Sequence, residues 1–459
     1  MKFFEHAVAA ISLLSSASLV AGAPHVFEVT PKEFKVSTLG GATFKISQVY
    51  NTNFKQAGKG PRALGKVYSK FGVDFPPELA AVLKALLDQL RIKPLGNGRN
   101  MSGVGWNQTT GVNQTYGSPD VDEDDQGEVA ATPNGLFDTE YLAPVEIGTP
   151  PQTLMLNFDT GSSDMWVFSS DTPRNLQTGH VLYDVTKSST AKLLEGETWA
   201  IRYGDGSNSS GNVYLDTVTI GGVTVENQAV ESALDVSASF RQDTASSGLV
   251  GLAFDSLNTI APTSQKTFFS NALETLAMPL FTANLKRGEA GNYNFGFIDP
   301  TEFTGPISFV DVNKTSGFWQ FEADGFSVGN GEAITNRHKA IADTGTTLLL
   351  LPNSIVENYY RRVLSARYSM TDGGYVFSCN ETLPDLTLNI GTYKAVVPGD
   401  FIRFAPTVGE TFEGADSCYG GLQSQGNINV AIYGDVFLKA QFTVFHAGDS
   451  KVGFAPKPQ

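Results

Sequence analysis

Two short segments decide the fold: LNFDTGSS at residues 156–163 and AIADTGTT at residues 340–347. Each has an apolar lead-in, then Asp-Thr-Gly, then a hydroxyl residue. A second similarity follows each of them, GLVGLAF at 248–254 and VAIYGDVF at 430–437, where two apolar residues precede a glycine. A single Asp-Thr-Gly means little because it is also a good turn sequence. Two such elements 184 residues apart, each with its downstream partner, indicate two copies of one β-unit that share an interface.

The chemistry suggested by this pair needs Asp159 and Asp343 close together. Peptide hydrolysis without a metal or a covalent nucleophile needs a general base to activate water and a general acid to protonate the leaving nitrogen. Two adjacent carboxyl groups cannot both ionise cheaply, so one stays protonated, a rule for which aspartic proteases are the standard example. The predicted supporting residues are small Gly161 and Gly345, bracing Thr160 and Thr344, and the hydroxyl donors Ser162 and Thr346.

Bulk composition favours a mostly β protein with more than one folding unit. A chain of 459 residues is too long for a single hydrophobic core. Its 47 glycines and 31 phenylalanines, and segments such as EYLAPVEIG and NVYLDTVTIGGVTV, indicate short strands and many turns. TFFSNALETL and NSIVENYYRRVLSA are the best helical candidates of this body. A formal charge of −15 argues against a nucleic-acid partner.

Residues 1–22 have the sequence pattern of a signal peptide, in which a lysine is followed by an apolar run and then by small residues. We therefore expect a secreted, extracellular protein, and no later stretch is apolar enough to suggest a membrane span. Asn-X-Ser/Thr triplets are candidate glycosylation sites that fit this route, and they begin at Asn100, Asn107, Asn113, Asn208, Asn313 and Asn380.

The two cysteines and five histidines limit the other chemistry of the chain. Cys379 and Cys418 are the only cysteines, so a disulfide between them is the economical interpretation in an oxidising compartment, with two separate thiols as the alternative. Patterns typical of zinc sites are absent from the sequence, so we expect neither a metal nor another cofactor.

Charge divides the chain sharply. Residues 24–117 hold 12 Lys/Arg against 5 Asp/Glu, whereas residues 129–459 hold 19 against 35. The acidic tract SPDVDEDDQGE lies between them and is typical of a solvated linker. Before it, PPELAAVLKALLDQLRI shows helical apolar spacing. This helix could belong to an independent domain or to a basic segment that docks on the acidic body.

The sequence resembles the pepsin family, and within it the secreted fungal pepsin-like enzymes. IADTGTTLLLLP, NYNFGFIDP, GGYVFSC and GDVFLKAQFTVF carry the resemblance, which covers about residues 129–459. It implies an all-β, bilobal fold with a pseudo-twofold axis, few short helices and a long cleft, and the activity of an aspartic endopeptidase. The expected divisions are a signal peptide at 1–22, an activation pro-segment with the acidic linker at 23–128, an amino-terminal lobe at 129–304 and a carboxy-terminal lobe at 305–459.

The same resemblance identifies IRYGDGSNSSG at 201–211 as a flap over the cleft, with a plain hairpin as the alternative. Tyr203 matches the flap tyrosine that lies near Trp166, and Gly206 would give a backbone N–H to the substrate. In fungal relatives, an aspartate at the position of Asp205 is associated with substrates that have lysine next to the scissile bond, as well as with substrates that have a large apolar residue there. Further matches to the first specificity pocket, which could equally be ordinary core, are Phe240 and Leu249.

In this family a basic pro-segment fills the cleft as an intramolecular inhibitor until acidification. Lys70, in KVYSKFGVDFP, resembles the lysine that places its ammonium over the catalytic aspartates. Lys66 is a rival, and a merely solvated lysine is an equal alternative. Processing should fall between about Asp125 and Asn134. The family implies polypeptide substrates and a monomer; a catalytically dead binding protein of the same fold is the competing hypothesis, disfavoured because both aspartates are present.

Overall fold

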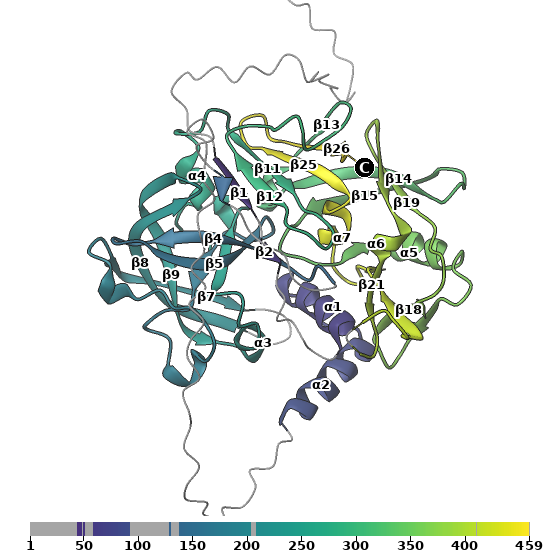
Figure 1. Cartoon of the computed structure of the whole chain (residues 1–459), viewed down its shortest axis with the longest axis horizontal. Coiled ribbons are helices and arrows are strands. Elements are labelled where there is room, and N and C mark those ends of the chain that lie inside the picture. The colour runs from purple at the N-terminus through teal and green to yellow at the C-terminus, as the bar shows by residue number, and fades with distance from the viewer. Residues whose placement is uncertain are drawn as a thin grey trace, which may run out of the picture.

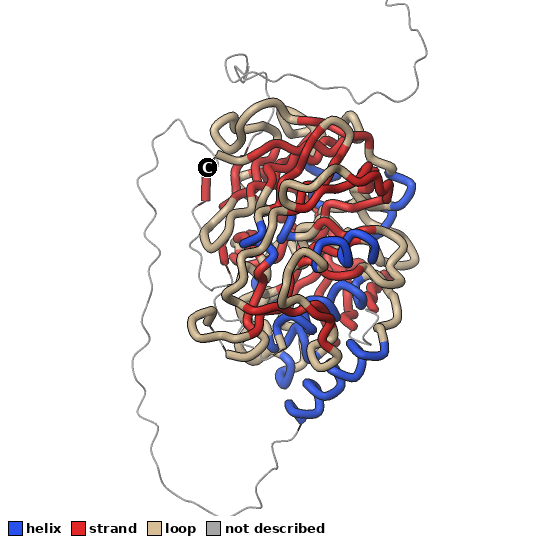
Figure 2. Tube along the Cα trace, turned by 90° about the vertical axis from the view of Figure 1, so that its right-hand side faces the viewer, coloured by secondary structure: helices blue, strands red, loops and turns tan. Residues whose placement is uncertain are grey.

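The computed structural model describes residues 44–47, 49–50, 58–91, 128–129, 137–202, 208–409 and 411–458. Strands dominate these residues and form two lobes, with the first two helices between and below them (Figure 1). Figure 2 shows strands throughout the body and α2 projecting from one end. The predicted all-β, bilobal class is confirmed. Within the described part of the chain, no helix is long and apolar enough to cross a membrane.

Each lobe has its own sheet system. The amino-terminal sheet has eight strands in the order β2-β4-β5-β10-β6-β9-β8-β7. Their bounds are Val49–Tyr50, Tyr141–Ile147, Gln152–Asp159, Gly248–Gly251, Met165–Val167, Val223–Val236, Asn208–Ile220 and Lys192–Arg202. The carboxy-terminal lobe has a seven-stranded sheet in the order β20-β19-β14-β15-β24-β16-β23. These strands are Tyr393–Val397, Leu386–Ile390, Gln320–Val328, Ile334–Ala342, Ala431–Tyr433, Leu349–Leu351 and Leu422–Ser424.

The carboxy-terminal lobe also carries a four-stranded sheet, β17-β18-β22-β21. Its strands are Arg367–Ser369, Gly374–Ser378, Ser417–Gly420 and Arg403–Pro406. Cys379, directly after β18, is joined by a disulfide to Cys418 in β22 across a separation of 39 residues. The predicted disulfide is therefore present, and it ties together the two central strands of this sheet.

A fourth sheet, of seven strands, joins the halves of the molecule in the order β13-β26-β25-β11-β12-β1-β3. Its strands are Ser308–Asp311, Lys451–Pro456, Gln441–His446, Leu280–Asn284, Asn292–Phe295, Phe44–Ser47 and Glu128–Val129. β11 and β25 meet at the join, where the rings of Phe281 and Phe445 stack with centroids 4.6 Å apart. β1, from the basic segment, pairs with β12 and so extends the sheet that links the lobes.

The helices of the described residues are α1 (Lys59–Lys70), α2 (Pro77–Arg91), α3 (Ala238–Gln242), α4 (Phe268–Ala272), α5 (Asn353–Tyr360), α6 (Gly399–Ile402) and α7 (Asp435–Leu438). Short 3₁₀ turns occupy Arg174–Leu176, Val185–Lys187, Asp255–Leu257 and Lys314–Ser316. The helix expected from PPELAAVLKALLDQLRI is α2. The two best helical candidates of the body form only as short elements, α4 and α5.

Helices α1 and α2 pack on the carboxy-terminal lobe instead of forming a core of their own. Leu64, Val67 and Leu79 are buried in one apolar cluster with Leu350 and Ile432. Burying such a side chain contributes about 1.5–3 kcal/mol. Of the two hypotheses for this segment, docking on the acidic body therefore describes the observed packing.

The internal repetition seen in the sequence appears directly in the strand pairing. β10 runs parallel to β5, with Gly251 beside Asp159. β24 runs parallel to β15 in the other lobe, with Tyr433 beside Ala342. Each downstream segment thus lies against the strand that carries its own Asp-Thr-Gly. Both lobes place an aspartate at the end of an inner strand, and the two ends face each other.

Candidate active site

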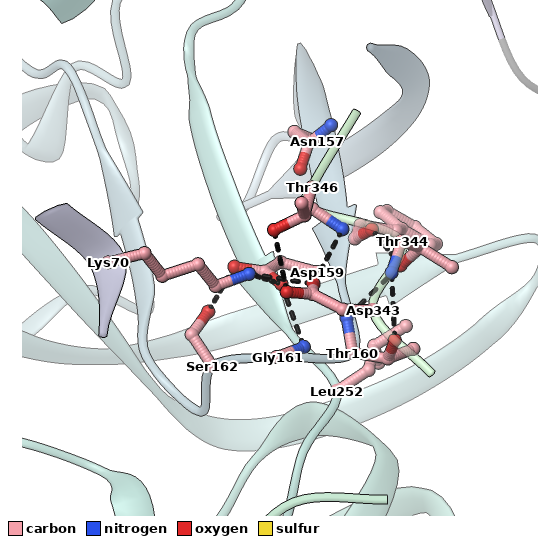
Figure 3. Close-up of polar contacts among 12 residues, drawn as sticks. Lys70, Asn157, Asp159, Thr160, Gly161, Ser162, Leu252, Asp343, Thr344 and Thr346 are labelled. Atoms are coloured by element: carbon pink, nitrogen blue, oxygen red, sulfur yellow. Dashed lines mark hydrogen bonds and ion pairs between the residues drawn. The ribbon is translucent and has the colours of Figure 1, made fainter. Parts of the chain in front are cut away.

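The two Asp-Thr-Gly loops contact each other, and their aspartates lie together (Figure 3). Asp159 ends β5 and Asp343 follows β15. Asp159 is 3% exposed and Asp343 is fully buried. The two carboxyl groups, which the chemistry needs close together, both lie within reach of one lysine side chain.

A symmetric set of hydrogen bonds between the two threonines locks the loops together. The backbone N–H of Thr160 donates to the Thr344 hydroxyl at 3.1 Å, and the N–H of Thr344 donates to the Thr160 hydroxyl at 3.0 Å. Each hydroxyl then donates across the lobe boundary, Thr160 to the carbonyl of Ala342 at 2.8 Å and Thr344 to that of Phe158 at 2.6 Å. The threonines thereby fix the relative position of the lobes at the site.

Each aspartate is oriented by one amide and one hydroxyl. The N–H of Gly161 donates to Asp159 Oδ1 at 2.8 Å, and the Ser162 hydroxyl donates to Oδ2 at 2.7 Å. On the other loop, Gly345 N–H and the Thr346 hydroxyl bind Asp343 Oδ1 and Oδ2 at 3.0 and 2.7 Å. These donors hold both carboxylate planes in place before any substrate binds.

Glycine is required at both loops because each one touches the opposite aspartate. A Cβ on Gly161 would lie 2.6 Å from the carboxyl carbon of Asp343 and 2.6 Å from Lys70 Nζ. A Cβ on Gly345 would overlap the carboxyl carbon of Asp159. The absence of side chains is therefore what allows the two carboxyl groups to approach.

We expect Gly345→Ala to lower kcat/KM by about 100-fold, because the methyl group forces the Asp159 carboxyl out of line. The measurement is steady-state hydrolysis of a quenched fluorescent peptide at acid pH. The thermal unfolding midpoint of the same preparation is the control for folding. A folded variant with the wild-type kcat/KM would contradict the close-approach argument.

Lys70, the last residue of α1, places its ammonium between the two aspartates (Figure 3). Its Nζ lies 2.6 Å from Asp159 Oδ1 and 2.7 Å from Asp343 Oδ1. Lys66, one turn earlier, is exposed. Of the two lysines considered, Lys70 is the one that contacts the pair, and its side chain is 8% exposed.

The electrostatics of this triad combine burial with charge pairing. Burial alone would lower the pKa of Lys70, but the charges and hydrogen bonds of both aspartates outweigh it and raise that pKa. Burial favours a higher pKa for Asp159, yet contact with Lys70 holds it below the ordinary value. Burial, reinforced by repulsion from Asp159, keeps the pKa of Asp343 above its ordinary value despite Lys70.

The expected pocket residues of the amino-terminal lobe gather in one cluster. The Trp166 ring packs edge-on against Phe240 at 5.0 Å, and Leu249 belongs to the same cluster. The Trp166 indole N–H has no hydrogen-bond partner among the described residues. Its expected neighbour Tyr203 lies outside them, as do Asp205 and Gly206.

Some of the candidate glycosylation sites likewise lie within the described residues and others lie outside them. Asn313 and Asn380 are exposed, whereas Asn208 is half-buried and its amide donates to Asp235 at 2.8 Å. Asn100, Asn107 and Asn113 lie outside the described residues. In the described ranges, no group of three or more His, Cys, Asp or Glu side chains could hold a metal ion.

Sequence reasoning missed several buried charges around the site. Lys439 and Asp138 form an ion pair at 2.7 Å with both side chains almost fully buried. Asp164 and Glu231 lie behind the first catalytic loop and are 2% and 0% exposed. A signal was present for Glu231, because an acidic residue stands alone in the otherwise apolar and small stretch AVESAL at 229–234, which lies in β9.

Comparison with known proteins agrees with this geometry. The family model described as eukaryotic aspartyl protease matches residues 140–457. Endothiapepsin of Cryphonectria parasitica is 45% identical over 420 residues, covering 91% of each chain. Aspergillopepsin-1 of Aspergillus fumigatus and penicillopepsin-3 of Penicillium janthinellum are each 49% identical over 331 residues, covering 72% of this chain and 82% of theirs. With both aspartates, their threonine bracing and their glycines in place, this chain belongs to the eukaryotic aspartyl protease family as a pepsin-like aspartic peptidase.

Proposed function

We propose that the chain is the secreted zymogen of an aspartic endopeptidase that acts at acid pH, with Asp159 and Asp343 as its catalytic pair. The observation that carries the proposal is the Lys70 ammonium within 2.7 Å of both carboxylates. A peptidase whose two catalytic groups are both engaged by its own chain is latent. It must expel that segment before a substrate can bind.

Once Lys70 has left, the pair shares one proton. The ionised carboxylate takes a proton from a water molecule as the water oxygen attacks the peptide carbonyl carbon. The protonated carboxyl gives its proton to the carbonyl oxygen. When the resulting diol breaks down, a proton passes to the amide nitrogen, the C–N bond cleaves, and an acid and an amine leave. The donors Ser162 and Thr346 keep the outer oxygens oriented throughout.

The inhibitory segment comprises residues 23–128 in this proposal, after a signal peptide at 1–22 and before lobes at 129–304 and 305–459. Three contacts of this segment support it: strand β1 in the sheet between the lobes, the apolar packing of α1 and α2, and Lys70. Residues 24–117 carry a net positive charge and residues 129–459 a net negative charge, which favours docking of the segment. Processing between about Asp125 and Asn134 would remove all three contacts at once.

Secretion is supported by the amino-terminal sequence pattern and by the disulfide. We expect a monomer, with glycans at the Asn-X-Ser/Thr triplets. The substrates would be polypeptides cleaved beside large apolar residues, with Trp166, Phe240 and Leu249 forming the apolar side of the pocket.

Asp205 is proposed to extend this preference to lysine. In a peptide library, Asp205→Ser should lower cleavage after lysine by roughly 10–100-fold, because a charge-assisted hydrogen bond is lost. Cleavage after phenylalanine or leucine by the same preparation is the internal control. The role of Asp205 is rejected if lysine cleavage is unchanged, or if both classes of cleavage fall together.

The test of the proposed function is casein digestion after brief acidification of the purified full chain. We expect digestion at acid pH and none before acidification. Absence of digestion by a folded protein at every pH would instead support a binding protein with this fold.

A further inference from the structure

Two carboxyl groups that the catalytic mechanism does not use lie side by side behind the first catalytic loop. Asp164 follows that loop and precedes β6, and Glu231 lies on β9. These strands run parallel, with Trp166 beside Glu231. The Asp164 carbonyl accepts from Gly251 N–H at 2.9 Å, so Asp164 is also tied to β10, the strand that pairs with the Asp159 strand.

One amide holds both carboxyl groups. Asn258 Nδ2 donates to Asp164 Oδ1 at 2.8 Å and to Glu231 Oε1 at 3.2 Å. Asp164 Oδ1 also accepts from Thr259 N–H at 2.7 Å, and Glu231 accepts a backbone bond from Met165. The remaining Glu231 oxygen, Oε2, is buried and has no donor among the described residues. Asn258 thus bridges two buried carboxyl groups, and a proton held by the pair would give Glu231 Oε2 the donor that it lacks.

Among the described residues, none of the titratable groups found to act on the pair is positively charged. The titratable groups that face it are the two carboxyls themselves and Asp159 of the neighbouring loop. The neighbouring strands β6 (Met165–Val167) and β10 (Gly248–Gly251) contain no charged residue. The nearby 255–259 turn contributes Asn258 and Thr259. Lys70 faces Asp159, and no ion pair involves Asp164 or Glu231 within the described ranges.

We propose that Asp164 and Glu231 share a proton that fastens β6 to β9, and that loss of this proton opens the amino-terminal lobe as the pH rises. The pair positions the first catalytic loop and limits the folded state to acid and near-neutral pH. It takes no part in the chemistry, so the inference stands apart from the proposed function.

The direction of the pH dependence follows from burial. Burial, and for Glu231 also the charge of Asp164, raises both pKa values above the ordinary ones. The folded chain therefore binds this proton more tightly than the unfolded chain does. Stability is highest below the ordinary glutamate pKa and falls as the pH rises through the folded value.

Glu231→Gln tests the proposal, because its amide can accept from Asn258 and donate permanently to Asp164. Thermal unfolding of the full chain is followed by tryptophan fluorescence between pH 5 and pH 8. We expect the pH at which stability is half lost to move upward by about one unit. Glu226→Gln, an exposed change on the same strand, should leave the profile unchanged.

Asp164→Asn is an independent test, because the new amide can donate a hydrogen bond to Glu231. It should shift the profile in the same direction, and combining it with Glu231→Gln should add no further shift, since either change removes the same shared proton. If Glu231→Gln does not fold, Asp164→Asn decides the question. Wild-type pH profiles in the folded variants would overturn the proposal, whatever the peptidase activity of the chain.

Discussion

Replacing Asp159 or Asp343 by asparagine is expected to lower kcat for peptide hydrolysis by roughly 10⁴-fold, which leaves no detectable casein digestion. Asparagine keeps the shape of the side chain and still accepts from Gly161 or Gly345. It can neither take a proton from water nor hand one to the substrate. Because the carboxyls act as one unit, the double variant should be no worse than either single variant.

The matched control is Asp311→Asn, an exposed aspartate far along the chain, which should keep full activity. Unfolding midpoints separate loss of chemistry from loss of fold. Activity that survives both single substitutions would refute the assignment of the pair. An inactive wild type with a normal unfolding midpoint would point to a binding protein.

The sequence was most informative where the chemistry is repeated. Two Asp-Thr-Gly segments predicted that Asp159 and Asp343 lie together. Their downstream partners predicted two copies of one β-unit, and each of them forms a strand, β10 or β24, that runs parallel to the strand that leads to its own aspartate. These features can be recognised in the sequence because the close approach of the two loops requires glycine. The hydrogen bonds between the loops and to the aspartates require hydroxyl side chains. The symmetric threonine bonds are the structural counterpart of the repeated tripeptide.

Features that depend on long-range burial were harder to predict. Helix α1 was not predicted, because Gly60, Pro61 and Gly65 weaken its helical signal. Its glycines fit the docked surface: a Cβ on Gly60 would overlap the ring of Tyr419. Asp164 and Glu231 looked like isolated acids, since 67 residues of sequence separate them and only the parallel pairing of β6 and β9 brings them together.

Replacing Lys70 by alanine is expected to release the inhibitory segment at a higher pH than in the wild type. Removing one partner of a buried charge cluster leaves two carboxylates without compensation, at a cost of about 3–5 kcal/mol to the docked state. That cost corresponds to a roughly 10²–10⁴-fold shift toward the undocked state. The measurement is the pH at which half of the purified full chain becomes processed and active.

The sign of this shift follows from proton linkage. Contact with Lys70 holds the pKa of Asp159 below its ordinary value in the docked state, so Asp159 binds a proton there less tightly than an ordinary aspartate does. The pKa of Asp343 stays above its ordinary value, so Asp343 protonates first as the pH falls. The contribution of this contact to docking is therefore present above the ordinary pKa of an aspartate and is lost as the pH falls through the lowered pKa of Asp159. Lys70 itself, with a raised pKa, stays charged throughout and is not the group that titrates.

Lys66→Ala is the matched control, since it removes the same charge from an exposed position one turn away on α1. It should move the activation midpoint less than Lys70→Ala does, because the exposed Lys66 acts through its charge on Asp435 and not by direct contact with the Asp159–Asp343 pair. If Lys70→Ala and Lys66→Ala behave alike, latency depends on the total charge of the segment. If only Lys70→Ala moves the midpoint upward, latency depends on one ammonium held between two acids, and protonation of those same acids is what removes it.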